Sequence, residues 1–277
     1  RCLVGSEMCI RDRLLSGEQT FNKNESCEYQ DLEYPDDCIV DFDMRLIDLF
    51  KEIDKKKLTL KMQIRQEYYR VKELLDGKRP SRMDLFTYMD DEIYRICVSG
   101  SHAKENPFQQ YLDFLYELGE LSEDEQKLYA GIGREFIQTI ETTEMQKVYK
   151  MPILYSFYNH GNIRLAVTDE EVLESWKEFF DTGTNWKDFP NVNTYEDYKK
   201  VTDKQHLSKA KRMPIRFLKA SGKGFFVEKD GYALALRDEI GDVVGNMAFG
   251  EQMGDVLGYR SLEYYRRRYK KNRSEGD

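Results

Sequence analysis

The sequence predicts a mainly α-helical fold with small β hairpins, an α+β class, divided into two helix-rich units. Apolar residues recur at helical spacing over most of the chain after residue 40, whereas short alternating segments bounded by turn residues occur only in its second half. With 277 residues, of which 40% are hydrophobic and 13% aromatic, the chain can bury one large core or two small ones.

The first unit is expected over residues 41–145 and is predicted to be helical. Ile64, Tyr68 and Val71 recur at helical spacing before Gly77 ends their helix. The spacing therefore places one apolar face of this helix against a core.

Two capping boxes predict further helices in the same unit. Ser81 stands three residues before Asp84, and Ser122 stands three residues before Glu125. Such pairs satisfy the free N–H groups of a first helical turn. The second helix is expected to continue through Ile140.

The second unit is expected over residues 146–273. Residues 153–157 and the alternation over 163–167, separated by a turn signal at 159–162, predict a short strand pair. A hairpin is expected over 224–236, turning on Lys-Asp-Gly.

Helices complete this second unit. Thr168 and Glu171 form another capping box, which opens an amphipathic helix that ends at Gly183. A basic helical stretch is expected before the hairpin, and a final helix rich in Tyr and Arg follows it.

The beginning of the chain is expected to lie outside the fold. Residues 1–13 do not open with Met, show no periodicity and closely resemble the translated read-through of a sequencing adapter. We expect them to be an artefact, with the upstream part of the gene product missing. Residues 14–40, rich in Asn, Glu and Asp, predict an acidic linker.

Charge is distributed unevenly along the chain. The formal net charge of -8 argues against a general nucleic-acid binder, because phosphate binding depends on clustered Lys and Arg. However, residues 25–43 carry carboxylates without one Lys or Arg, whereas residues 199–223 and 260–273 are basic. This asymmetry is what a partner carrying one sign of charge would select. The alternative is that both basic runs are ordinary solvated faces.

Cysteine and histidine do not form a metal-site pattern. The five cysteines include no Cys-x-x-Cys pair and there are only three histidines, so no zinc site or other metal is expected. No apolar run is long enough to span a bilayer and no secretion signal is present. We therefore expect a cytoplasmic chain with free thiols and no membrane partner.

Motifs for self-contained catalysis are absent. There is no Gly-x-x-x-x-Gly-Lys-Ser/Thr, hence no RecA-like motor domain, and no Gly-x-Ser-x-Gly or His-Glu-x-x-His. Residues 88–91, Tyr-Met-Asp-Asp, match the metal-binding tetrad of reverse transcriptases, but helical stripes flank them. We expect these acids at a helix N-terminus and predict no catalytic residue. The rival hypothesis, a nuclease or polymerase built on Asp90, predicts metal-dependent activity that Asp90→Asn abolishes.

Three basic segments suit phosphate contacts. The first, around Arg79 and Arg82, surrounds a helix N-terminus. The second, from Lys209 to Lys219, shares part of a helical surface. The third, around Arg266, interleaves aromatic rings with cations, which can stack bases and neutralise phosphates. The alternatives are a capped turn, a solvated helix and cations that offset a helix dipole. The candidate nucleic-acid-binding residues are Arg79, Arg82, Lys209, Lys211, Arg212, Arg216, Lys219, Tyr265, Arg266, Arg267 and Arg268.

Several of these segments carry a resemblance. Residues 69–86 are similar to the helix, Gly-Lys/Arg-Arg-Pro-Ser/Thr, helix unit found after the motor in some superfamily 2 helicases. Other segments resemble the C-terminal region of bacterial DEAD/DEAH-box helicases, notably those of Firmicutes. They are residues 140–143, 149–154, 157–163, 214–218, 225–232 and 260–269. The resemblance covers roughly residues 40–271.

This resemblance implies a non-catalytic C-terminal accessory region of an ATP-dependent DNA helicase active in defence or repair. ATP and Mg are then expected only for the missing motor domains, and this part of the chain takes no cofactor. The expected partners are DNA, with RNA left open, and the upstream motor domains. A protein-interaction scaffold, which docks the motor domains or a partner subunit through aromatic surfaces, is the alternative; steep salt dependence would separate the two.

Overall fold

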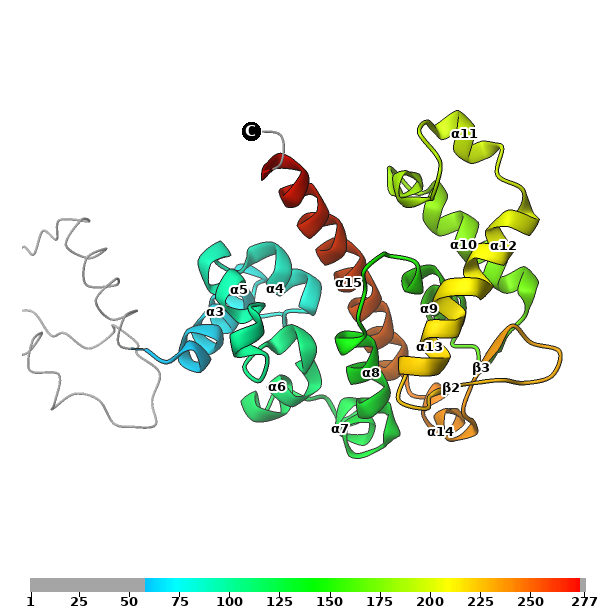
Figure 1. Cartoon of the computed structure of the whole chain (residues 1–277). Helices are drawn as coiled ribbons and strands as arrows, with labels where there is room; N and C mark the ends of the chain where they lie inside the picture. Colours follow the sequence, from blue (N-terminus) through cyan, green and yellow to red (C-terminus); the bar gives the residue numbers. More distant parts are fainter. Residues whose placement is uncertain (1–57, 275–277) are drawn as a thin grey trace, which may run out of the picture. The chain divides into compact units, whose positions relative to one another are not determined.

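Residues 58–274 are the part of the chain that the computed structural model describes, with side chains described through Tyr269. They belong to one compact unit, Lys57–Asp277. Helices dominate this unit and one small antiparallel sheet accompanies them, so the predicted fold class is confirmed (Figure 1). The expected artefact, the acidic linker and the start of the first helical unit lie outside the described residues.

The first half of the described chain is helical, as predicted. Its elements are α3 (Leu60–Leu74), α4 (Arg82–Tyr88), α5 (Asp91–Cys97), η1 (Gly100–His102), η2 (Pro107–Gln109), α6 (Tyr111–Leu118), α7 (Glu123–Ala130) and α8 (Ile132–Thr142). Both predicted capping boxes form, Ser81 with Asp84 and Ser122 with Glu125. Each box satisfies free N–H groups at the start of its helix.

The helix expected from Ser122 through Ile140 is in fact two helices. Gly131 is extended, with φ -112° and ψ -170°, and separates α7 from α8. A Cβ placed on Gly133 would lie 2.1 Å from a Leu128 methyl carbon, so the two helices pack closely across this break. The prediction of one helix was therefore wrong, because the capping signal marks where a helix starts and does not show its length.

The second half mixes helices with short strands. Its elements are α9 (Lys150–Tyr158), η3 (Asn159–Gly161), β1 (Ala166–Val167), α10 (Asp169–Asp181), η4 (Asn185–Asp188), α11 (Tyr195–Lys199), α12 (Asp203–Ala210), the π-helix η5 (Lys211–Ile215), α13 (Arg216–Ser221), β2 (Phe226–Val227), β3 (Leu234–Leu236), η6 (Asp238–Ile240), α14 (Gly241–Val244) and α15 (Met247–Ser274). The capping box of Thr168 and Glu171 opens α10 as predicted.

The sheet has the order β1-β3-β2 and both pairings are antiparallel. The hairpin predicted over 224–236 forms, with Phe226 opposite Leu236. The strand pair predicted over 153–157 and 163–167 does not form, since the first segment lies within α9 and β1 pairs with β3. Helix α9 is buried on nearly all sides, which gives a continuous apolar run that resembles a buried strand.

Two hydrophobic cores organise this unit. The first core is built mainly from α3 to α6 and includes Tyr68, Leu85 and Phe108; the second core is larger and includes Phe136 and Trp176. Buried apolar residues of α7 and α8 belong to the second core, so the cores divide the chain at a different place from the predicted units 41–145 and 146–273.

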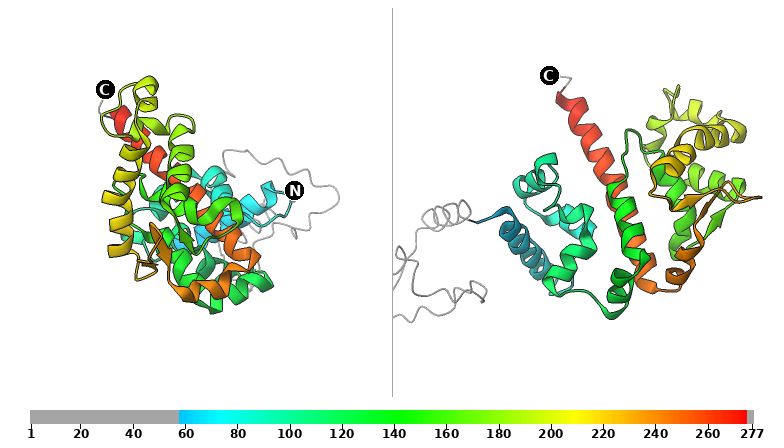
Figure 2. Two further views of the ribbon diagram at one scale, coloured as in Figure 1. Left: turned by 90° about the vertical axis from the view of Figure 1, so that its right-hand side faces the viewer. Right: turned by 60° about the horizontal axis from the view of Figure 1, so that its bottom comes forward.

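The long helix α15 joins the two cores. It adds Tyr259 to the first core and Met253, Val256 and Leu257 to the second. In two further views α15 runs between the α3–α6 group and the elements that follow α8 (Figure 2). Because one rigid helix contributes to both cores, it fixes their relative positions.

Cys97 gives a simple test of the first core. It is fully buried, and burial raises the pKa of its thiol to about 12. Because the thiolate is the reactive form, we expect no labelling of Cys97 by iodoacetamide at pH 8 in the native protein and complete labelling in urea. Site-resolved mass spectrometry measures this, and rapid native labelling of Cys97 would contradict the packing described.

Candidate nucleic-acid interface

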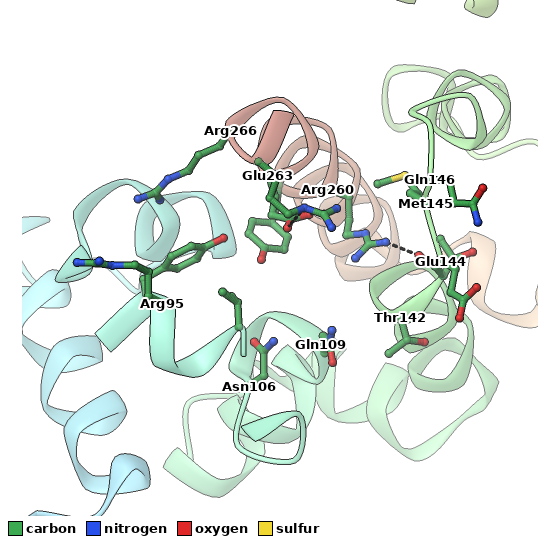
Figure 3. Close-up of a pocket in the computed structure, with 15 residues that line it drawn as sticks. Arg95, Asn106, Gln109, Thr142, Glu144, Met145, Gln146, Arg260, Glu263 and Arg266 are labelled. Carbon is green, nitrogen blue, oxygen red and sulfur yellow. Dashed lines mark hydrogen bonds and ion pairs between the residues drawn. The ribbon is translucent and has the colours of Figure 1, made fainter. Parts of the chain in front are cut away.

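A groove of about 570 Å³ lies between α5, η2, the segment 142–146 and α15 (Figure 3). Four arginines line it, Arg95, Arg260, Arg266 and Arg267. Two of them were predicted as nucleic-acid contacts from the sequence of the final helix. The carboxylates that line the groove are Glu144 and Glu263 alone, so its side chains carry an excess of positive charge.

Arg266 lies at the edge of the groove nearest α5. It forms an ion pair with Asp91, and its guanidinium carbon lies 5.1 Å from the Phe86 ring centroid and 4.7 Å from that of Tyr94. Cation–π contacts of this kind hold an arginine without removing its charge. Arg266 is therefore fixed in place between α15 and the first core.

Two of the groove arginines are exposed. Arg267 pairs with Glu263, with Nε 2.6 Å from Oε1. Arg95 donates from Nε to the Asp91 carbonyl oxygen at 3.1 Å. Both side chains therefore remain accessible to solvent.

Arg260 is the buried arginine of the groove. It is 8% exposed, and its Nη2 donates to the Thr143 carbonyl oxygen. Burial lowers the pKa of Arg260 below its ordinary value; the charge of Glu263 opposes this shift and that of Arg267 adds to it. This side chain thus carries a charge in a place where burial disfavours it.

Two amides lie on the floor of the groove. Asn106 Oδ1 accepts from the Phe108 N–H at 2.9 Å and so caps η2. The Gln109 side chain comes from the same short helix and also lines the groove (Figure 3). Amide groups offer both donors and acceptors to a polar ligand.

A second group of cations lies beyond the segment that borders the groove. Burial and the neighbouring cations Arg212 and Lys147 lower the pKa of Lys209, which places these three residues close together. Lys209 Nζ also lies 5.0 Å from the Tyr149 ring centroid. We call Lys147, Lys209 and Arg212 the lysine cluster, and Lys147 directly follows the groove-lining segment.

The remaining predicted cations, on η5 and α13, are engaged in other contacts. Lys211 pairs with Asp169 at 2.6 Å, and Lys219 pairs with Glu228. Arg216 is exposed, and its guanidinium carbon lies 5.5 Å from the centroid of the adjacent Phe217 ring. Ion pairs at such exposed positions are weak and exchange readily, so these cations remain reachable by a competing anion.

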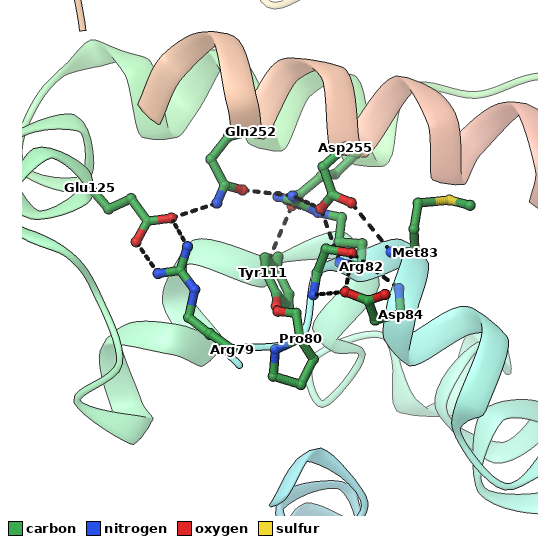
Figure 4. Close-up of polar contacts among 11 residues, drawn as sticks. Arg79, Pro80, Arg82, Met83, Asp84, Tyr111, Glu125, Gln252 and Asp255 are labelled. Atoms are coloured by element: carbon green, nitrogen blue, oxygen red, sulfur yellow. Dashed lines mark hydrogen bonds and ion pairs between the residues drawn. The ribbon is translucent and has the colours of Figure 1, made fainter. Parts of the chain in front are cut away.

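Arg82 does not lie on any surface. Its side chain is fully buried, with Nε 3.0 Å from Glu141 Oε1 and Nη1 2.9 Å from Asp255 Oδ2 (Figure 4). Its guanidinium carbon also lies 4.5 Å from the Tyr111 ring centroid. The prediction of a phosphate contact therefore needs correction, because Arg82 has no exposed surface with which to reach a phosphate and instead joins α4, α8 and α15.

Arg79 belongs to the same buried network. It forms a forked ion pair with Glu125, and Gln252 of α15 donates to the same carboxylate at 2.7 Å (Figure 4). Glu125 is 1% exposed, and the pKa of its carboxyl is lowered because these hydrogen bonds outweigh the effect of burial. Arg79 is thus committed to this structural pair and lies apart from the groove.

Arg268 and Tyr265 also have structural surroundings. Arg268 forms an ion pair with the buried carboxylate of Asp188, which also accepts from the Tyr264 hydroxyl at 3.1 Å. Tyr265 is partly buried, and its hydroxyl group has no partner among the described residues. The structure therefore brings Arg266 and Arg267 to the groove and anchors Arg268 to η4.

The Tyr-Met-Asp-Asp tetrad forms a helix start. Asp90 caps α5, accepting from the Glu92 N–H at 2.9 Å and the Ile93 N–H at 3.2 Å. This is the helix-end position expected from the sequence. Within residues 58–274 no group of three or more His, Cys, Asp or Glu side chains is arranged to hold a metal ion.

Several groove residues were missed by the sequence analysis. Arg260 lies inside the predicted basic run but was not selected, since nothing in the run distinguishes a groove-facing arginine from its neighbours. Arg95, Asn106 and Gln109 come from another part of the chain and carry no motif. Only the folding of α5 and η2 against α15 brings them together.

Within the described residues, no helix has both the length and the apolar character needed to cross a bilayer. Comparisons with protein-family models, curated proteins and solved structures find no match to this chain. Its function is therefore argued from the groove and its surroundings.

Proposed function

We propose that residues 58–274 bind nucleic acid along the groove and the lysine cluster, and guide it for an ATP-dependent motor. The observation that carries this proposal is that four arginines from two distant parts of the chain line one groove. Clustered cations with adjacent polar groups are what phosphate recognition requires. The lysine cluster extends this surface past residue 147.

The net charge of the whole chain does not oppose this proposal. Over residues 58–274 Lys and Arg nearly equal Asp and Glu in number, and most of the acidic excess lies elsewhere in the sequence. Local potential, rather than total charge, determines where a polyanion binds. A concave arginine-lined surface on a nearly neutral unit is therefore compatible with binding DNA.

The resemblance to bacterial superfamily 2 helicases supplies the wider context of the proposal. Under it, this chain is a C-terminal accessory region that does not hydrolyse ATP, while ATP and Mg bind to upstream motor domains in the cytoplasm. DNA is the proposed polymer and RNA the alternative. The motor domains are the proposed protein partner.

Binding to the groove should depend steeply on salt. We expect an Arg95→Gln/Arg267→Gln variant to bind a fluorescein-labelled DNA strand about tenfold or more weakly, and the slope of log affinity against log salt to fall by about 1.4 to 1.8. Fluorescence anisotropy at several salt concentrations measures both. Both residues are exposed, so the change should leave the fold intact.

The matched control removes two exposed cations elsewhere, as Arg65→Gln/Lys229→Gln. This control should bind DNA only slightly more weakly, because it loses long-range attraction alone, and its slope of log affinity against log salt should stay close to that of the wild type. Absence of binding at low salt, or equal effects of the two double variants, would contradict the proposal.

A docking scaffold is the second candidate. Large apolar side chains are exposed at Met247, Tyr116 and Leu74, with fractional exposures of 76%, 59% and 58%. Tyr116 also stacks on Tyr129, with ring centroids 4.6 Å apart. Exposed apolar groups suit a protein partner, and association through them should vary little with salt.

A further inference from the structure

His206 is a buried histidine in an aromatic cluster. It is 2% exposed, whereas the side chains of His102 and His160 are 40% and 78% exposed. The centroid of its ring lies 4.9 Å from that of Phe189 and 5.5 Å from that of Tyr198. We call Phe189, Tyr198 and His206 the histidine cluster. It joins α12, which carries His206, to α11 and to the residue that follows η4.

The histidine cluster offers the imidazole little polar contact. Nδ1 of His206 is buried and has no hydrogen-bond partner among the described residues. Within residues 58–269 the ion pairs that involve histidine are those of His102 and His160, and His206 forms none. A protonated imidazole carries an N–H on both nitrogens, so protonation would make Nδ1 a buried donor without an acceptor. Burying such a donor together with a charge costs free energy.

The charged groups around His206 act in both directions. On α10, Lys177 disfavours the protonated ring and Asp181 favours it, and on α12 itself Asp203 favours it. From α11 the ring faces the Tyr198 phenol, which stays neutral because burial raises its pKa. Burial has the largest effect on the imidazole, so the pKa of His206 lies below its ordinary value of 6.5 in spite of the two carboxylates.

The polar contacts that link this region to α10 are exposed. Lys177 pairs with Asp203 at 2.9 Å, with the two side chains 45% and 63% exposed. The Tyr195 hydroxyl donates to Asp181 at 3.2 Å, also at the surface. Exposed contacts of this kind contribute little to stability. The packing of the histidine cluster is therefore important for holding α11 and the first turns of α12 in place.

We propose that His206 makes this attachment acid-sensitive, so that protonation of its ring releases α11 and α12 from α10 while the first core stays folded. The inference goes beyond the proposed function and does not depend on it. Local openings of this kind occur in folded proteins and involve free energies well below that of global unfolding. Because α12 also carries Lys209, the release would loosen the lysine cluster as well.

The direction of the pH effect follows from the two states of the imidazole. In the released segment the ring is solvated and binds a proton with its ordinary pKa of about 6.5. In the closed histidine cluster it binds a proton only at lower pH. The released form therefore holds more protons between these two values, so the closed form is fully favoured above about pH 7 and loses this advantage as the pH falls through about 6.5.

Hydrogen exchange of the full chain, followed by mass spectrometry, tests the proposal. Exchange rates are measured at about pH 7.5 and about pH 5.5 and corrected for the intrinsic effect of pH on exchange. Peptides covering residues 195–210 report the release, and peptides covering residues 60–74 of α3 serve as an internal reference. The variant is His206→Gln, and the matched control is His102→Gln, the same change at an exposed histidine.

We expect acid to raise the corrected exchange of residues 195–210 by about threefold to tenfold in the wild type and in His102→Gln, since one proton is involved. Residues 60–74 should change by less than about twofold. His206→Gln should abolish the acid response whatever its exchange at neutral pH, because the readout is the change with pH. If His206→Gln does not fold, His206→Phe gives the same test, since it keeps an aromatic ring that does not titrate.

Equal acid responses in the wild type and in the His206 variant would overturn the proposal, as would unchanged exchange of residues 195–210 in the wild type. A rise of the same size over residues 60–74 would show a general loss of stability rather than a local release. That result would likewise overturn the role assigned to His206.

Discussion

Arg82→Ala should lower the free energy of unfolding by about 3 to 5 kcal/mol. The change removes a fully buried cation and leaves Glu141, which is 1% exposed, without its ion-pair partner. It also removes the hydrogen bond to Gln252 Oε1 at 2.6 Å. Urea unfolding followed by the fluorescence of buried Trp176 measures the loss.

The matched control is Lys61→Ala. Lys61 of α3 forms an ion pair with Glu117 in which both side chains are more than half exposed, and exposed pairs contribute about 0.2 to 1 kcal/mol. Combining Arg82→Ala with Glu141→Gln should cost less than the sum of the two single changes, because each removes the same interaction. A loss below about 1 kcal/mol for Arg82→Ala would show that the network does not hold α4 to α8 and α15.

Phe136→Ala should be comparably damaging, with a loss of about 3 to 5 kcal/mol. Phe136 is fully buried at the centre of the second core, where its ring centroid lies 5.3 Å from that of Phe225 and 5.6 Å from that of Phe249. Truncation therefore leaves a cavity between α8, the region around β2 and α15. The same urea titration measures this loss, from the midpoint of unfolding and the slope of the free energy of unfolding against urea concentration.

Phe217→Ala provides the comparison for this change. Phe217 is 44% exposed on α13, and its truncation should alter stability by no more than about 0.5 kcal/mol. Equal losses for Phe136→Ala and Phe217→Ala would contradict the assignment of the second core.

Local chemistry made much of the fold predictable. The capping boxes at Ser81, Ser122 and Thr168 each open a helix, because satisfying free N–H groups depends only on residues three apart. The hairpin of β2 and β3 was predictable for the same reason, since its turn residues determine its position. Each of these signals is complete within a few residues.

Predictions that depended on tertiary surroundings were less successful. The apolar run within α9 could not be distinguished from a strand, because a helix buried on nearly all sides loses its periodic pattern. Arg82 was placed on the surface because its partners, Glu141 and Asp255, lie 59 and 173 residues away. The groove was only partly predictable, since Arg260 differs from the other arginines of α15 in its surroundings and not in its sequence.

The position of α15 has a consequence for how the chain folds during synthesis. This helix supplies Tyr259 to the first core and Val256 and Leu257 to the second, and it leaves the ribosome after every other described element. Until then each core exposes the apolar face that α15 will cover, and Arg82 lacks Asp255. Native packing of the two cores must therefore wait until α15 has been released, and until then their uncovered apolar faces are open to aggregation.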